Sequence, residues 1–343
     1  MIKKMKEKFK LLTLTLSMFW FVQTNAQDLH FTQYFNSPLL VNPANTGFVP
    51  DYDFRIGGNY RTQWASTSVP YKTMSVWGDI QLFNNRFENG WMGIGGALLK
   101  DKAGTGNLST TRAFGSVAWH QMLGYNSLLS AGFNIGYVQK SIDFTKLTFD
   151  NQWNGKFFDI TAPPNESFIT NQVGYFDLQA GLNYALFASD NAYFNAGISM
   201  AHLNRPSESF FSDSATDTRV PTRYTGFLNG VFKLNEQWIV SPNMYYSLMA
   251  GASELVIGAN ANYNLSGDGT TQLIGGMYYR LGDAIAPVIG FQLKDYKLTF
   301  NYDATMSGLK TYNATRGAYE ISLVKQGLFD TGKELKCTTP KFL

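Results

Sequence analysis

The sequence predicts an all-β protein, a transmembrane antiparallel β-barrel of about fourteen strands. Segments of roughly ten residues alternate apolar and polar side chains, Gly, Asn and Asp separate them, and charged residues make up only 15% of the chain. A period of two is typical of strands with lipid on one side and water on the other. The low charge, against roughly 25% in soluble proteins, indicates that much of the surface does not face water.

The segment 127–140 shows the alternation clearly. Phe133 and Ile135 fall on one face, whereas Ser130 and Asn134 fall on the other. A row of asparagines in a dry core would be unfavourable without partners, so we expect the inner face to line a wet lumen. The same pattern predicts strands at 52–64, 71–83, 91–100, 108–121, 127–140, 173–186, 192–203, 220–234, 237–249, 254–265, 270–281, 285–293, 296–304 and 316–325.

Connection lengths predict the orientation of the barrel. If both chain ends lie in the periplasm, every second connection is a short periplasmic turn. The even connections are all short, whereas the long segments 141–172, 204–219 and 305–315 are odd ones. We therefore expect residues 52–325 to form the barrel, with the long segments at the cell surface and residues 326–343 as a periplasmic tail.

Aromatic residues crowd the ends of the predicted strands. We expect them to form girdles at the two membrane interfaces. The set comprises Trp64, Trp77, Trp91, Trp119, Trp238, Tyr278 and Tyr279.

The N-terminus predicts export. Five lysines between residues 3 and 10 precede an apolar stretch, Leu11 to Val22, and the small residue Ala26 follows. This is typical of a signal peptide, residues 1–26, cleaved before Gln27. The apolar stretch is shorter than the ~18 residues of a spanning helix. Together with the barrel pattern, it predicts a bacterial outer-membrane location.

A search for chemistry finds no catalytic constellation. The histidines are His30, His120 and His202, and none has a metal-ligand spacing or a nucleophile motif beside it. We therefore predict a protein that is not an enzyme and binds no cofactor or metal, with His120 and His202 at the membrane interfaces. The mature chain has no Lys/Arg cluster, so we predict that it does not bind nucleic acid. The single cysteine, Cys337, excludes an intramolecular disulfide.

The first segment that is not strand-like is 27–51, which we expect in the periplasm. It is rich in aromatic residues, Asn and Pro, unlike a plain tail. It either plugs the periplasmic mouth of the barrel or forms a docking surface for a periplasmic partner, and both roles are compatible. Phe31, Tyr34 and Phe35 are its candidate partner contacts.

The second such segment is the long connection 141–172. It carries six aromatic residues, more apolar material than an exposed loop normally shows. It either folds into the lumen or binds another protein at the cell surface. Its candidate partner contacts are Trp153, Phe157, Phe158 and Asp159, and its other aromatic residues include Phe149 and Phe168.

Several short motifs resemble one family. The exported start, Gln27 to Phe35 (QDLHFTQYF), is followed by Asn42-Pro43-Ala44 and Gly47, then by Tyr60-Arg61-Thr62-Gln63-Trp64 and Lys146-Leu147-Thr148-Phe149. These residues are similar to those of the PorP/SprF family, outer-membrane proteins linked to type IX secretion in Bacteroidetes, and the resemblance spans essentially the mature chain.

The resemblance implies a non-enzymatic membrane component of type IX secretion. Some members anchor a secreted adhesin, including gliding adhesins, so the implied partners are membrane lipid, such an adhesin or its C-terminal domain, and periplasmic components of the secretion system. The rival function is a passive or selective pore, because a polar inner face also suits a channel.

Overall fold

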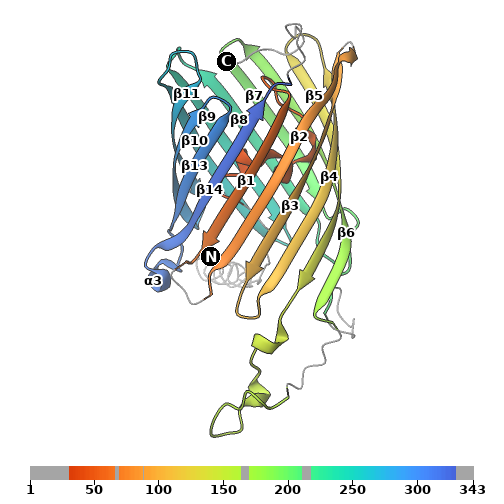
Figure 1. The fold of residues 1–343 in the computed structure, drawn as a ribbon, viewed down its shortest axis with the longest axis vertical. Helices are drawn as coiled ribbons and strands as arrows, with labels where there is room; N and C mark the ends of the chain where they lie inside the picture. Colours follow the sequence, from red (N-terminus) through yellow and green to blue (C-terminus); the bar gives the residue numbers. More distant parts are fainter. Residues whose placement is uncertain (1–30, 66–68, 88, 164–169, 211–217, 330–343) are drawn as a thin grey trace, which may run out of the picture.

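The computed structural model describes residues 31–65, 69–87, 89–163, 170–210 and 218–329, which form a closed antiparallel barrel (Figure 1). Fourteen strands follow one another in chain order, and β1 closes the barrel by pairing with β14. They are β1 (Phe54–Gln63), β2 (Tyr71–Phe87), β3 (Gly90–Ala103), β4 (Leu108–Met122), β5 (Ser127–Ser141), β6 (Gln172–Ser189), β7 (Ala192–Ala201), β8 (Arg223–Lys233), β9 (Trp238–Met249), β10 (Ala252–Asn264), β11 (Thr271–Arg280), β12 (Ala284–Leu293), β13 (Tyr296–Thr305) and β14 (Arg316–Gly327).

The predicted fold class and strand number are confirmed, and every predicted strand overlaps an observed one. The last strand runs past the predicted end because Gly327 pairs with Phe54. The predicted tail therefore begins after Gly327, and residues 330–343 lie outside the described residues, as do the predicted signal peptide and Cys337. No helix among the described residues is long and apolar enough to cross a membrane.

The two faces of the wall differ as the alternation predicts. Outward side chains such as Ile135 and Ile198 are apolar and exposed, at 55% and 65%. Inward side chains are polar, but they are not wet: Asn134 is 2% exposed and donates to Gln179 over 3.3 Å. The expectation of a wet lumen is therefore wrong at this level, because protein fills it.

The aromatic girdles are confirmed only in part. Trp119, Trp238 and Tyr279 are exposed at strand ends. Trp77 and Tyr278, by contrast, face inward and are almost completely buried. Trp91 is buried as well. Three of the seven predicted girdle residues are therefore buried in the barrel and do not lie at a membrane interface.

The two ends of the barrel differ in their connections. The connections that follow β2, β4, β6, β8, β10 and β12 are short and lie at one end, the upper end in Figure 1. The other end carries the long loops 142–171, 202–222 and 306–315. By the rule for bacterial barrels, the short turns face the periplasm and the long loops face outward. We call these the periplasmic end and the surface end.

Residues 31–51 lie inside the barrel and form a plug. Two 3-10 helices, η1 (Tyr34–Asn36) and η2 (Pro43–Asn45), flank a single helical turn, α2 (Pro38–Val41). Pro38 and Pro43 start their helices, where a missing N–H is tolerated. For residues 31–51 the expected periplasmic location is wrong, because the segment packs against the inner wall along the lumen rather than at its mouth.

Candidate functional site

The plug begins among buried charges at the surface end. Arg61 of β1 donates to Asp303 of β13 over 2.9 Å and to Thr32 Oγ1 over 2.8 Å. Glu320 of β14 accepts the backbone N–H groups of Thr32 and Gln33 over 3.0 and 3.1 Å. Each of these buried charges is thus paired or hydrogen-bonded, as burial requires. The first residues of the plug complete this network.

Asn42 fixes the middle of the plug to the wall. Its Oδ1 accepts the N–H of Ala44 over 2.8 Å, which caps η2. Its Nδ2 donates to the carbonyls of Leu182 (2.9 Å) and Ile198 (3.0 Å), paired residues of β6 and β7. A Cβ on Gly181 would lie 2.1 Å from Asn42 Oδ1, so the plug can approach only a glycine here.

The plug ends near the periplasmic end of the barrel. Gly47 donates its N–H to Asp79 over 2.7 Å and accepts from the Trp91 indole over 3.0 Å. The ring of His120 contacts the carbonyl of Thr46, with 2.8 Å between Nε2 and the oxygen. His120 is therefore a buried luminal residue, and its predicted interfacial position is wrong. His202 is also buried, 2.8 Å from Asp177.

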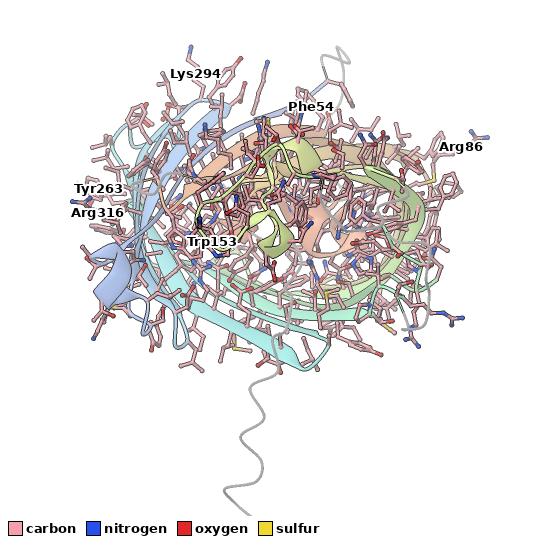
Figure 2. All side chains as sticks on the ribbon, turned by 90° about the horizontal axis from the view of Figure 1, so that it is seen from below. Phe54, Arg86, Trp153, Tyr263, Lys294 and Arg316 are labelled. Carbon is pink, nitrogen blue, oxygen red and sulfur yellow. The ribbon has the colours of Figure 1, made fainter. Side chains whose placement is uncertain are left out.

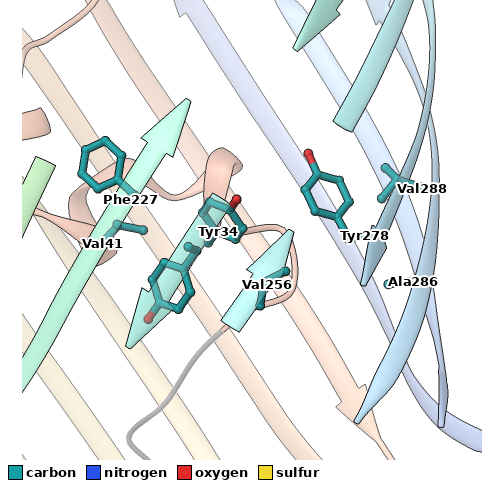
Figure 3. Packing of buried hydrophobic residues seen from close by; sticks show 8 residues of the cluster. Tyr34, Val41, Phe227, Val256, Tyr278, Ala286 and Val288 are labelled. Carbon is teal, nitrogen blue, oxygen red and sulfur yellow. The ribbon is translucent and has the colours of Figure 1, made fainter. Parts of the chain in front are cut away.

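The plug joins opposite walls of the barrel. Tyr34 and Val41 pack against a cluster on β8–β12 that includes Phe227 and Tyr278 (Figure 3). A second cluster joins the other wall to the plug and comprises Phe31, Leu39, Trp77, Ala97, Leu99, Phe114 and Val324. The lumen is therefore filled at this level. A cavity of about 240 Å³ remains between the plug and strands β7 to β11 and β13, toward the periplasmic end.

These contacts decide between the two predicted roles of the segment. Phe31 and Tyr34 are each 6% exposed, and Phe35 stacks on Tyr278 with ring centroids 5.0 Å apart. A docking surface needs accessible side chains, so the prediction that these three residues contact a periplasmic partner is wrong. Phe31, Tyr34 and Phe35 instead belong to a plug, the other role predicted for this segment.

The longest loop projects from the surface end as an arm, residues 142–163. Figure 1 shows it below the barrel, and in the end-on view of Figure 2 it overlies the lumen opening. Its tip is a hairpin with a bridge between Trp153 and Phe158. Asn154 Oδ1 accepts the N–H groups of Lys156 and Phe157, each over 3.0 Å, and Gly155 turns the chain at φ +91°.

Gln152 holds the arm together from within. It is 4% exposed, and its Oε1 accepts the N–H of Phe149 over 2.9 Å. Its Nε2 donates to the carbonyl of Ala162 over 2.9 Å, and its own carbonyl accepts from Asp159 over 2.8 Å. One side chain thus ties both legs of the hairpin.

The arm tip presents apolar side chains to solvent. Trp153 is 54% exposed, Phe157 60% and Phe158 43%. Asp159 accepts the N–H and the hydroxyl of Thr161, and these hydrogen bonds hold the pKa of its carboxyl below the usual value. The structure thus brings these four predicted site residues together, away from the lumen. Phe168, also in this loop, lies outside the described residues.

The described residues of a second loop, 202–210 and 218–222, lie at the surface end. Glu208 accepts from Lys140 Nζ of β5 over 2.7 Å and from the Tyr175 hydroxyl of β6 over 2.9 Å. At its root, Asp177 pairs with Arg112 of β4 over 2.8 Å and with His202. The loop therefore braces the tall side of the barrel, next to the arm.

Among the described residues, no group of three or more His, Cys, Asp or Glu side chains could hold a metal ion. The functional residues missed at the sequence level are the plug contacts Asn42, Arg61, Asp303 and Glu320 and the arm brace Gln152. Asn42 and Arg61 belonged to recognised motifs, yet their partners are far away in the chain.

Comparison with solved structures finds other barrels of the outer membrane. The toluene transporter TodX of Pseudomonas putida has a TM-score of 0.51 at 10% identity, over 84% of this chain and 92% of that chain. The toluene transporter TbuX of Ralstonia pickettii reaches 0.49 at 11% identity, over 85% and 94%. At such identity the likeness to TodX shows the fold alone. Among curated protein sequences, none shows significant similarity to this chain.

Comparison with protein families gives a match over most of the chain. The family described as type IX secretion system membrane protein PorP/SprF matches residues 23–324, which includes the plug, the arm and nearly the whole barrel. The motifs that carried the resemblance have structural roles here, since Asn42 anchors the plug and Arg61 joins its charged network. This chain belongs to the PorP/SprF family of type IX secretion system membrane proteins.

Proposed function

We propose that this outer-membrane barrel retains a secreted surface protein, an adhesin of the type IX route or its C-terminal domain, by binding it through the arm. The observation that carries the proposal is the tip itself, where Trp153, Phe157 and Phe158 are exposed on a braced hairpin beyond the surface end. Exposed aromatic residues with a polar rim are typical of binding hot spots. A gliding adhesin is one such partner.

The plug supports retention over solute uptake. A pore needs a continuous path, whereas the plug here bridges opposite walls at mid-lumen. A filled barrel serves as a rigid platform for its loops instead. We further propose that the chain carries no catalytic activity, that its signal peptide is cleaved before Gln27, and that periplasmic secretion components meet its short turns.

The test replaces Trp153, Phe157 and Phe158 together by Ala. Each buried aromatic anchor is worth ~2 kcal/mol, so the triple variant should release the retained protein into the medium with retention weakened by orders of magnitude. Quantitative mass spectrometry of cells and medium measures this. Heat-modifiable gel mobility should not change, because the arm makes no part of the barrel wall.

A matched control replaces exposed apolar residues elsewhere at the surface end. Met306 and Leu309 of the loop 306–315 are 50% and 47% exposed, and their double Ala variant should retain the partner. If the arm variant assembles normally and retains every surface protein while small solutes enter faster, the arm is not the anchor. That result would favour the alternative function, a pore.

A further inference from the structure

One strand edge stays open at the surface end. β6 pairs with β5 from Gln172 onward, but with β7 only from Gln179, opposite Ala201. Because β7 ends at Ala201, residues 172–178 of β6 have a strand on one side only. Figure 1 shows this end of β6 at the lower right of the barrel.

Asn204 of the neighbouring loop covers part of this edge. Its Nδ2 donates to the carbonyl of Phe176 over 2.7 Å, and its Oδ1 accepts the N–H of Leu178 over 3.2 Å. These bonds show that even-numbered residues of β6 turn their backbone groups toward the missing neighbour. The N–H and C=O of Gly174 and the N–H of Phe176 point the same way, and no strand of the described chain pairs with them.

The open edge lacks the usual protection. Natural edge strands carry charged residues or proline, which discourage pairing with another chain. Residues 173–176 (VGYF) contain neither. Gly174 is exposed, and beside it Tyr137 and Phe176, 44% and 65% exposed, meet edge to face with ring centroids 5.4 Å apart. Backbone donors and acceptors thus lie next to an exposed apolar pair.

We propose that this edge binds an extended segment of the secreted protein, which adds to β6 as a further strand. The proposal rests on the proposed function and names the mode of binding. The arm begins directly after β5, which pairs with residues 172–178 of β6, so a protein held at the arm lies next to the open edge. In strand addition, backbone hydrogen bonds give affinity and flanking side chains give specificity.

The test uses a matched pair at one position, in cells that carry the full-length protein with an unaltered arm. Gly174→Pro removes an N–H that faces only the open edge, so pairing with β5 is kept. Gly174→Ala keeps this N–H and places the same Cβ against the Tyr137 hydroxyl, 2.1 Å away. The Pro variant should release the retained surface protein about tenfold faster than the Ala variant, since one backbone hydrogen bond is lost and its acceptor left unpaired.

A second pair, Phe176→Pro and Phe176→Ala, gives the same comparison should Gly174 variants assemble poorly. Equal retention in Pro and Ala variants, with release by the triple arm variant, overturns strand addition and leaves the proposed function standing. Retention by the arm variant overturns the proposed function itself. If native gels show a barrel dimer that only the Pro variants lose, while retention is unchanged, the occupant is a second copy and the proposal is wrong.

Discussion

The guanidinium of Arg61 lies 2.9 Å from the carboxylate of Asp303, and both side chains are almost completely buried. The same Asp303 also contacts Arg280, and Arg61 also reaches Glu320, 3.3 Å away. These four charged side chains all hydrogen-bond to Thr32, at the first described residues of the plug. The network connects β1, β11, β13 and β14 to the plug.

Arg61→Met should loosen both the wall and the plug. Removing one partner of a buried ion pair leaves uncompensated charge, which typically costs about 3–5 kcal/mol. We expect a lower temperature for the shift in heat-modifiable mobility and a higher conductance in planar bilayers. Arg316→Met, at an exposed arginine at the start of β14, is the control and should behave as the unaltered protein. Unchanged conductance in Arg61→Met would show that the plug is held without this network.

Glycines on the inner wall should be required for the plug. A Cβ on Gly132 would lie 2.3 Å from the carbonyl carbon of Pro43, whereas a Cβ on Gly115 would meet nothing within 4 Å. Gly132→Ala should therefore destabilise the protein by roughly 1–3 kcal/mol and raise conductance, because backbone must shift. Gly115→Ala adds the same methyl group on the outer face and should be neutral. Equal stability of the two variants contradicts the close approach of plug and wall.

The strands of the barrel wall could be predicted from the sequence because the features that define a strand lie within the strand itself. Alternation with a period of two and turn residues at the right spacing mark each strand without knowledge of its partner. The plug depends instead on contacts between distant residues, such as Asn42 with Leu182 or Thr32 with Glu320. No local pattern gives such contacts, so the lumen was expected to be wet. A cue was present in inward glycines such as Gly132, which have no reason to be small in an open lumen.

The candidate site was predicted in part for a related reason. The excess of aromatic residues in 141–172 indicated that this loop packs against something, but composition does not say whether that is the lumen or another protein. The direction of the arm follows from Gln152, Asn154 and Asp159, whose hydrogen bonds hold a hairpin outside the barrel. Phe31 and Tyr34 are also aromatic residues of a segment that is not strand-like, yet they pack against the barrel wall.

Cysteine labelling tests the orientation. In a Cys337→Ser background, cysteines at Lys156 or Leu309 should react with an impermeant maleimide on intact cells, because both positions are exposed at the surface end. A cysteine at Tyr125, fully exposed in a short turn, should react only after permeabilisation. Labelling of Tyr125→Cys on intact cells, with Lys156→Cys protected, reverses the assignment of the two ends.

Gln152→Ala separates the bracing of the arm from contact with the partner. Gln152 is buried within the arm and offers a partner no surface, yet it makes hydrogen bonds to Phe149 and Ala162. Its loss leaves buried backbone groups unpaired, which typically costs 1–3 kcal/mol. We therefore expect protease cleavage of the arm on intact cells to rise about tenfold and retention of the surface protein to fall. Asn151→Ala removes one exposed hydrogen bond, to Pro163, and should change neither. If Gln152→Ala leaves the arm resistant to protease but still releases the partner, Gln152 itself contacts the partner and the hairpin is not held by this side chain.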